Sequence, residues 1–344
     1  GEVVNGAAEH LGLLHDAAFD REFAVALCQM MSENLKFDTN GSRLSAQAFE
    51  AIRLQDESEQ GQELYVRSLG VQQSNSSVRV GANYVLKVLR RIEDGINPDL
   101  ELGQYLTTVA QFPQVPATAG AVTQRSGRTR EAATLAILQH YVANVGDAWS
   151  YSLREIGRYY RAALTEAPQA HWHVERRGLF DLVGQQPDPR LRTLIGPYFD
   201  AVRLMGQRTA QMHQCLAAAT DNDSLVPEPF TTHYQRQLYQ GFRSLVGRTL
   251  DRLGENLGNM NEALSERALR LGERETELLS EFARIRDTSI SAVRIRIHGD
   301  YHLGQVLCTG NDFVIVDFEG EPIRALSERR IKRCPLRDVA GMLR

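Results

Sequence analysis

The sequence predicts a two-lobed α+β fold, in which a mainly antiparallel β layer is followed by a helical part. Short runs of β-branched and aromatic residues are concentrated before residue 144, which favours strands joined by turns. After Asn144, apolar residues recur at spacings of three and four, as in helices packed on one face. A chain of 344 residues that is 42% hydrophobic exceeds one small core and favours more than one domain.

In the first part, helical spacing covers residues 8–35, and residues 38–41 form a turn signal. Residues 44–80 are typical of short strands, with 64–66 and 77–80 the clearest. Strands are also predicted at 84–89 and 134–139. Between them, Asn97 suits a helix N-cap and Pro98 suits the first helical position, so a helix is predicted to begin there.

In the second part, helical periodicity predicts four helices, at 152–164, 190–219, 230–253 and 259–287, the last heavily charged and so largely solvated. Two short strands are predicted at 293–297 and 313–316. We expect an N-terminal cap subdomain (1–66), a β-rich lobe with a hinge (67–142) and a helical lobe (143–344). Because the chain starts at Gly1 without methionine and ends inside an apolar helical pattern, we expect a fragment whose helical lobe is truncated.

Composition narrows the function classes. The formal net charge is −4 and no block of lysine and arginine occurs, which argues against nucleic-acid binding. The four cysteines are far apart and favour neither a zinc ribbon nor a disulfide framework, so a reduced, cytoplasmic protein is expected. No apolar run reaches the roughly 18 residues of a membrane span, and no signal-peptide layout is present.

Two polar motifs follow the last two predicted strands. His298-Gly299-Asp300-Tyr301-His302-Leu303-Gly304-Gln305 follows the first strand, and Asp317-Phe318-Glu319-Gly320 follows the second. A hairpin between these strands would bring Asp300, Gln305 and Asp317 to one edge. Phosphoryl transfer needs a carboxylate that orients and deprotonates a hydroxyl, and hard oxygen ligands for magnesium. The two motifs therefore indicate phosphoryl transfer.

The spacing is similar to that of protein kinases, which use H-x-D-x-x-x-x-N and D-F-G. Here Gln305 stands in place of the asparagine, and Glu319 is inserted before the glycine. Phe318 is expected to be a core residue. Two alternatives remain open: the G-D-x-H of metallophosphoesterases, whose further motifs residues 310–312 do not supply, and ordinary structural histidines.

The upstream half should bind the nucleotide. Lys87 lies in an otherwise apolar strand, where an unpaired charge is costly, so it needs an anion. Pairing with Glu101 on the next helix would place its ammonium on the α and β phosphates, although a lysine that only snorkels to the sheet edge is the alternative. No G-x-G-x-x-G precedes it. Hydroxyl and amide groups in the preceding turn can offer donors to phosphate instead, namely those of Ser74, Asn75, Ser76 and Ser77.

The hinge between the lobes is predicted at residues 138–142, where Gln139 and Tyr141 would lie beside the adenine. Trp149, a little further on, is more typical of packing. The H-x-H at residues 171–173 is not expected to bind a metal.

Several runs resemble maltokinases, which are similar to aminoglycoside phosphotransferases in fold. They are residues 73–78, 86–91, 97–103, 144–149, 298–305, 317–322 and 335–342. The resemblance implies transfer of the ATP γ-phosphate to the anomeric hydroxyl of maltose, giving maltose 1-phosphate for glycogen-type α-glucan synthesis, with fusion to or association with trehalose synthase.

By the same resemblance, Asp300 would be the base, with His298 bracing its loop. Gln305 and Asp317 would bind Mg²⁺, and Lys87 with Glu101 would clamp the phosphates of ATP. Part of the sugar pocket would lie beyond Arg344. The residues leave two other hypotheses open: a kinase with another sugar or an aminoglycoside-like acceptor, and a catalytically inactive nucleotide-binding module.

Overall fold

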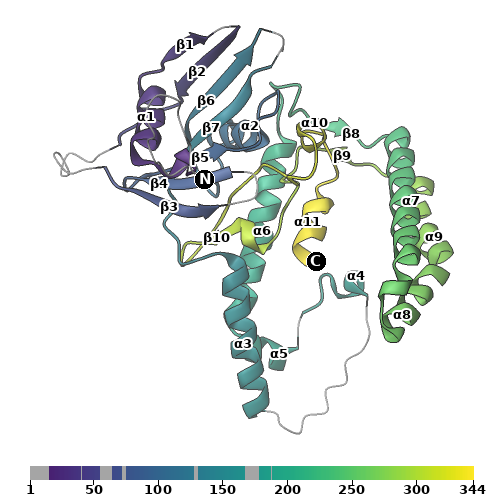
Figure 1. Cartoon of the computed structure of the whole chain (residues 1–344). Helices are drawn as coiled ribbons and strands as arrows, with labels where there is room; N and C mark the ends of the chain where they lie inside the picture. Colours follow the sequence, from purple (N-terminus) through teal and green to yellow (C-terminus); the bar gives the residue numbers. More distant parts are fainter. Residues whose placement is uncertain are drawn as a thin grey trace. The chain divides into compact units, whose positions relative to one another are not determined.

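The computed structural model describes residues 15–39, 41–54, 64–71, 75–127, 131–166, 178–186 and 188–344. These residues belong to two compact units (Figure 1). The first unit takes its residues from Gly1–Ala218, Arg296–Ile331 and Pro335–Arg344, and the second from Ala219–Ile295 and Lys332–Cys334.

An antiparallel sheet of strands β1 to β7 is the main feature of the first unit. The strands follow the order β1-β2-β6-β7-β5-β4-β3, and each neighbouring pair is antiparallel, as predicted. Their bounds are β1 (Lys36–Thr39), β2 (Ser42–Ala48), β3 (Val66–Val71), β4 (Asn75–Val80), β5 (Tyr84–Leu89), β6 (Thr118–Ser126) and β7 (Ala133–His140). The predicted strands at 77–80, 84–89 and 134–139 are thus confirmed.

Strand β6 is one element that the sequence prediction missed, although it lies between β2 and β7 in the sheet. Its first half is built of small residues without a β-type pattern. Gly120 shows why: a Cβ there would lie 2.8 Å from the Gln47 carbonyl oxygen and 3.1 Å from Met31 Sδ. The close approach of a neighbouring strand and helix therefore requires glycine at this position.

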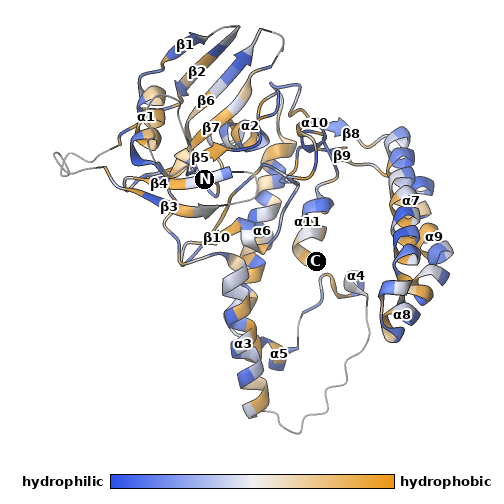
Figure 2. Cartoon of the chain, in the orientation of Figure 1, coloured by the Kyte–Doolittle hydropathy of each residue, from blue (hydrophilic) through white to orange (hydrophobic). Residues whose placement is uncertain are grey.

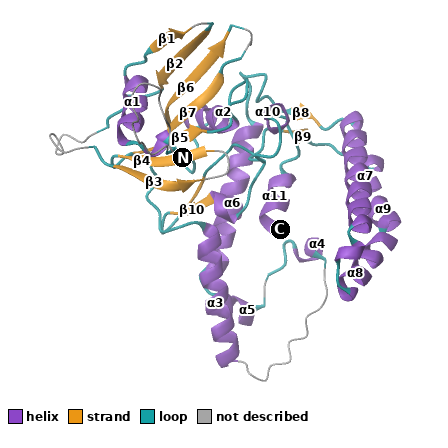
Figure 3. Cartoon of the chain, viewed as in Figure 1, coloured by secondary structure: helices purple, strands orange, loops and turns teal. Residues whose placement is uncertain are grey.

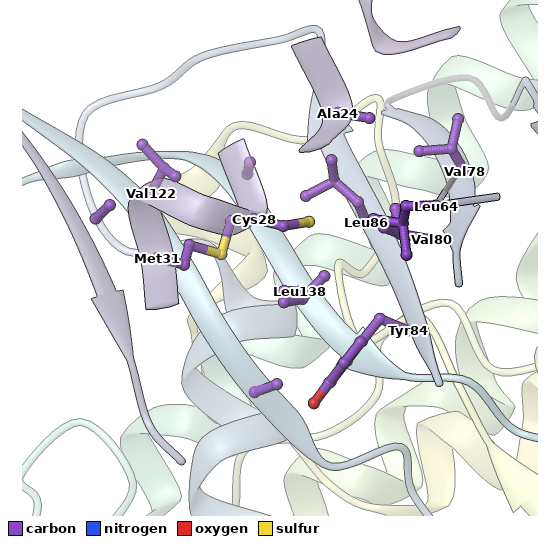
Figure 4. Packing of buried hydrophobic residues seen from close by; sticks show 13 residues of the cluster. Ala24, Cys28, Met31, Leu64, Val78, Val80, Tyr84, Leu86, Val122 and Leu138 are labelled. Carbon is purple, nitrogen blue, oxygen red and sulfur yellow. The ribbon is translucent and has the colours of Figure 1, made fainter. Parts of the chain in front are cut away.

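Helix α1 (Arg21–Ser32) covers one face of the sheet. Asp20 caps it by accepting a hydrogen bond from the Phe23 N–H at 2.9 Å. The residues that it buries, Ala24, Cys28 and Met31, pack on Val78, Leu86, Val122 and Leu138 of the sheet (Figure 4). The predicted helix at 8–35 corresponds to α1 and the preceding 3₁₀ turn η1 (Ala17–Phe19), and its residues 8–14 lie outside the described chain.

Helix α2 (Pro98–Gln104) packs on the other face and continues into a π-helical turn, η3 (Tyr105–Val109). As predicted, Asn97 is its N-cap and accepts a hydrogen bond from the Asp99 N–H at 2.8 Å. Leu100 contacts Ala121 and Ile137, which point away from the α1 side of the sheet. The cap thus fixes where α2 begins, and the packing of Leu100 turns one side of the helix toward the sheet.

The remainder of the first unit is mainly helix and loop. Its elements are α3 (Ala148–Glu166), α4 (Leu179–Leu182), α5 (Pro189–Ile195), α6 (Tyr198–Ala217), η5 (Leu303–Gln305), β10 (Val306–Cys308), β11 (Phe313–Ile315), α10 (Leu326–Arg329) and α11 (Leu336–Leu343). Residues 190–219 form two helices because Gly196 takes a φ of +63° and Pro197 follows it. Figure 3 shows that the chain between β9 and α10 is mostly loop, with the short strand β10.

One predicted pairing is wrong: the strand near 313–316 does not pair with 293–297. Instead β11 pairs with β10, because residues 309–312 form a tight turn in which Thr309 N–H donates to the Asp312 carbonyl at 2.9 Å. Val293 and Arg294 pair with residues 228–229. A short turn between adjacent strands costs less chain entropy than a longer loop.

The second unit is a helical hairpin with a small strand pair. It consists of β8 (Glu228–Pro229), α7 (Thr232–Glu255), η4 (Leu257–Asn259), α8 (Glu262–Glu273), α9 (Glu275–Asp287) and β9 (Val293–Arg294). Phe242 of α7 stacks on Phe282 of α9, with ring centroids 4.7 Å apart. Helix α8 has no buried residue, and hydrophilic residues alternate with apolar ones along all three helices (Figure 2). No helix in the described part of the chain has the length and apolar character to cross a membrane.

Candidate active site

Lys87 stands at the centre of a buried group of charges in the first unit. Its Nζ lies 2.7 Å from Asp99 Oδ2 and 3.3 Å from Asp317 Oδ1. Burial disfavours the charged lysine, but the nearby carboxylates of Asp99 and Asp317 outweigh it and raise the pKa of Lys87. The ammonium is therefore held charged between a helix and the loop that follows β11.

Asp99 connects the parts of this group. Its Oδ2 also accepts from the Gln139 side-chain amide at 3.4 Å, and its Oδ1 accepts from the Phe318 N–H at 3.0 Å. The carboxylate has no exposed surface. Asp99 thereby joins β5, β7 and the residue after Asp317.

The structure corrects the predicted Lys87–Glu101 pair, because the helix carboxylate bonded to Lys87 is that of Asp99. Residues two apart on a helix point about 200° away from each other, so Asp99 and Glu101 face different neighbours. Glu101 Oε2 lies 2.6 Å from Arg296 Nη1, and its Oε1 lies 2.9 Å from Arg330 Nη2.

The Glu101–Arg296 pair is almost fully enclosed, with the two side chains 6% and 1% exposed. Arg296 immediately precedes the loop that contains His298 and Asp300, whereas Arg330 follows α10. Glu101 therefore connects helix α2, on the sheet, to two later segments of the first unit.

Asp317 has a left-handed backbone, with φ of +69°, which is strained for a non-glycine residue. Its Oδ2 accepts a hydrogen bond from the Gln305 side-chain amide at 3.1 Å. Burial alone would raise the pKa of Asp317, but the charges of Lys87 and His298 and the hydrogen bonds from Lys87 and Gln305 lower it overall. Asp317 is thus an ionised carboxylate held in a defined orientation.

Asp317 and Gln305 fit a magnesium ion that is shared with phosphate oxygens. Magnesium commonly takes one or two protein oxygens and fills its octahedron with phosphate and water. The two side chains are in contact, and turning the terminal amide of Gln305 presents its oxygen on the same side. Among the described residues, no group of three or more His, Cys, Asp or Glu side chains is arranged to hold a metal.

The loop that contains His298 and Asp300 is held by contacts of the buried His298 side chain. His298 is 1% exposed, and its Nε2 lies 2.9 Å from the Val316 carbonyl oxygen, which makes Nε2 the protonated nitrogen. Its ring packs at 4.9 Å, centroid to centroid, from that of Phe318. His298 therefore positions the loop and is not placed to touch a substrate, whereas Phe318 is a core residue as expected.

Asp300 faces open space. Its side chain lines a cavity of about 520 Å³ together with His302, Glu321 and Arg337. Most of the side chains that line it are polar or charged, and two of them, Glu321 and Arg337, form an ion pair at 2.8 Å. A hydroxyl compound can therefore approach the Asp300 carboxylate from this side.

Asp338, on α11, is a site residue that the sequence interpretation did not assign a role. It is 1% exposed and accepts hydrogen bonds from the N–H groups of His298 at 2.9 Å and Gly299 at 3.0 Å. His213 Nε2 lies 2.9 Å from the same carboxylate. The one available signal was an aspartate in the first turn of an apolar helix, which the sequence alone reads as helix-dipole compensation.

The structure describes three of the four residues of the predicted phosphate-binding turn. Ser74 lies outside the described residues. Asn75, Ser76 and Ser77 are buried on β4, where Asn75 donates to Glu319 Oε1 at 3.0 Å and Ser77 donates to Asn75 Oδ1 at 2.9 Å. Ser76 donates to Asp16 Oδ2 at 2.5 Å. These side chains bond to protein groups and stay predictions as phosphate ligands.

The predicted hinge residues differ in their surroundings. Gln139 is buried against Asp99, inside the charge group. Tyr141 follows the end of β7, where its N–H donates to the Asn83 carbonyl at 2.7 Å and the Arg79 guanidinium lies 3.8 Å from its ring centroid. Trp149 is 56% exposed at the start of α3. Of these three residues, Gln139 contacts the carboxylate that is bonded to Lys87.

Comparisons of the sequence with known proteins find two similar kinases. No model of a known protein family matches the chain. A glucosamine kinase from Streptacidiphilus jiangxiensis is 24% identical over 278 residues, or 80% of this chain and 52% of that protein. A glucosamine kinase from Mycolicibacterium smegmatis is 25% identical over 277 residues, or 80% of this chain and 57% of that protein. The chain thus spans about half the length of the curated relatives it matches.

Solved structures agree on the architecture. A glucosamine kinase in complex with glucosamine, ADP and inorganic phosphate superposes with a TM-score of 0.60 at 20% identity, over 99% of this chain and 65% of that one. A crystal form of glucosamine kinase gives a TM-score of 0.58 at 20% identity, over 99% of this chain and 64% of that one. The predicted two-lobed, kinase-like α+β fold is therefore confirmed.

Proposed function

We propose that this chain carries the nucleotide site and the catalytic loop of an ATP-dependent kinase that phosphorylates a sugar hydroxyl. The observation that carries the proposal is the buried Lys87, bonded to Asp99 and Asp317 from two separate segments. A charged lysine beside an ionised aspartate and an amide is the arrangement that binds nucleotide phosphates together with magnesium.

Each residue then has a role that follows from its position. Lys87 contacts the phosphates of ATP, and Asp99 holds it in place. Asp317 and Gln305 hold Mg²⁺, which supplies neutralisation of the phosphate charge when it is bound. Asp300 orients the acceptor hydroxyl and takes its proton, because its carboxylate lines the open polar cavity. Asp338 keeps the loop of Asp300 in register through its two backbone hydrogen bonds.

The acceptor that the comparisons support first is glucosamine, since both curated relatives carry that name. The motif resemblance supports maltose, with maltose 1-phosphate as product and trehalose synthase as partner. Both are sugars with several hydroxyl groups and both suit a polar cavity beside a carboxylate. The acceptor assay below decides between them.

The full-length protein is incubated with Mg-ATP and, in separate reactions, glucosamine, maltose, glucose, trehalose or kanamycin, and ADP release is followed. We expect release that depends on one of the sugars and is lost in Asp300→Asn. A preference for maltose would support the hypothesis of a maltokinase. A preference for kanamycin would overturn the proposal that the acceptor is a simple sugar. Magnesium-dependent ATP binding without turnover of any acceptor would indicate an inactive nucleotide-binding module. Absence of ATP binding would overturn the kinase proposal.

A further inference from the structure

A second polar groove lies on the sheet, away from Lys87 and Asp300. It has a volume of about 690 Å³ and is formed by β1, β2, β6 and the turns beside them. Among the described residues that line it, three side chains are cationic, those of Lys36, Arg43 and Arg125, and one is acidic, that of Asp38. The whole chain has a formal net charge of −4, so a local excess of cations does not follow from composition.

Strand register places these side chains in two rows on one face. Asp38 is opposite Arg43, and Arg43 is opposite Arg125, so the three form a row across β1, β2 and β6. Two residues along, Lys36, Ser45 and Thr123 form a parallel row. Directly opposite residues of antiparallel strands point to the same side, and so do residues two apart. All six side chains therefore belong to one surface.

This surface faces away from helix α1. Ala46 and Val122, which alternate with the groove residues along β2 and β6, pack into the core beneath α1. Helix α2 lies on the groove side, but it contacts the sheet through Leu100 and Ala121, before the two rows. Figure 1 shows the ends of β1, β2 and β6 extending past α2, and Figure 2 shows the end of β6 to be hydrophilic. The groove is thus left open.

The arrangement of charge in the groove opposes folding. Arg43 and Arg125 are directly opposite each other, and like charges in that position destabilise a strand pair. Asp38 compensates only one of them: its Oδ1 lies 2.8 Å from Arg43 Nε, and both side chains are more than half exposed. Exposed ion pairs of this kind contribute little to stability. An anion between the two guanidinium groups would offset the repulsion.

We propose that this groove binds the phosphate group of a small molecule between Arg43 and Arg125, with Lys36 as a further cation. Guanidinium groups present paired N–H donors that match phosphate oxygens, and two of them from adjacent strands can bind one phosphate from both sides. Ser45 and Thr123 add polar groups beside it. The volume suits a single phosphate ester, and the patch is too small for a nucleic acid.

The experiment is isothermal titration calorimetry of the full-length protein with inorganic phosphate, with glucose 6-phosphate and with glucose as the neutral control. A saturating magnesium complex of the non-hydrolysable ATP analogue AMP-PNP is present throughout, so that all three phosphate positions of the nucleotide site are filled and do not contribute. We expect binding of one or both phosphates with Kd below about 1 mM, and no binding of glucose. The stronger ligand of the two tells whether the site takes free phosphate or a phosphate ester. Binding should weaken as NaCl rises from about 50 to about 200 mM.

Three variants test the geometry. Arg125→Gln should weaken binding about tenfold, since it removes one charge-assisted contact. Asp38→Asn should strengthen binding severalfold, because it removes the competing carboxylate from Arg43. Arg67→Gln, which changes an exposed arginine of β3 in the same sheet, is the control and should leave Kd unchanged.

Thermal unfolding gives a second readout of the same site. Phosphate should raise the Tm of the wild type and of Asp38→Asn more than that of Arg125→Gln, because only a bound ligand stabilises by mass action. The proposal is overturned if neither phosphate binds, or if Arg125→Gln and Arg67→Gln bind equally well. It is also overturned if Asp38→Asn binds more weakly than the wild type.

Discussion

Removal of the Glu101 carboxylate should destabilise the protein far more than removal of a neighbouring surface carboxylate. In Glu101→Ala, Arg296 loses its partner at 2.6 Å while its side chain stays 1% exposed. Two further nitrogens of the same guanidinium, Nε and Nη2, find no acceptor among the described residues. Burial already lowers the pKa of Arg296, and the charge of Glu101 opposes that effect. An uncompensated buried charge of this kind costs about 3–5 kcal/mol.

The assay is urea unfolding followed by circular dichroism. With a slope of about 2–3 kcal/mol per molar urea, the loss moves the midpoint down by roughly 1–2.5 M. The matched control is Glu131→Ala, which removes the other carboxylate bonded to Arg330. Glu131 lies 2.9 Å from Arg330 but is 57% exposed, so its loss should cost less than about 1 kcal/mol.

Equal midpoints for the two variants would refute the reasoning, because they would show that burial of the Glu101–Arg296 pair has no energetic consequence. A Glu101→Ala midpoint within about 0.3 M of the wild type would refute it as well. The pair joins α2 to the segment just before the loop of His298 and Asp300. If Glu101→Ala still folds, we therefore expect this loop to be displaced and Mg-ATP binding to be lost.

The remaining predictions concern the site itself. Lys87→Met should lower kcat/KM for ATP about 10²–10³-fold, because it removes a preorganised charge from the phosphates; an unchanged value in steady-state kinetics would place Lys87 outside the nucleotide site. Asp338→Asn puts an N–H₂ group against the N–H of His298 or Gly299, so kcat should fall tenfold or more while calorimetry shows ATP binding retained. Asp312→Asn, a control at a partly buried carboxylate that is bonded to Arg208 and lies away from Asp300, should keep normal kcat. Burial alone would raise the pKa of Asp338, but the hydrogen bonds from His213 and the loop outweigh it and hold the pKa below its usual value. The stability that the ionised Asp338 contributes is therefore present above about pH 4 and is lost as the pH falls further. A urea midpoint that stays constant from pH 5 to pH 3 would contradict this.

The sequence anticipated what depends on short-range rules. The cap at Asn97 and Pro98 placed the start of α2 correctly, because capping involves only neighbouring groups. The large apolar and β-branched residues of 84–89 and 134–139 predicted β5 and β7 for the same reason. Lys87 and Asp317 stood out because each follows a local pattern, a lone charge in an apolar strand and a polar motif at a strand end.

Tertiary structure decided the pairing of these groups. Lys87 is bonded to Asp99 rather than to Glu101 because α2 turns that face toward β5, and the angle of a helix about its axis depends on how it packs. Asp338 bonds to the loop of His298 and Asp300 from 39 residues away, through contacts that no local period describes. Strand β6 escaped prediction because its small residues are required by the close approach of β2 and α1, which exists only in the folded sheet. The sequence by itself thus determined which chemical groups are present and where the elements begin, and packing determined which groups meet.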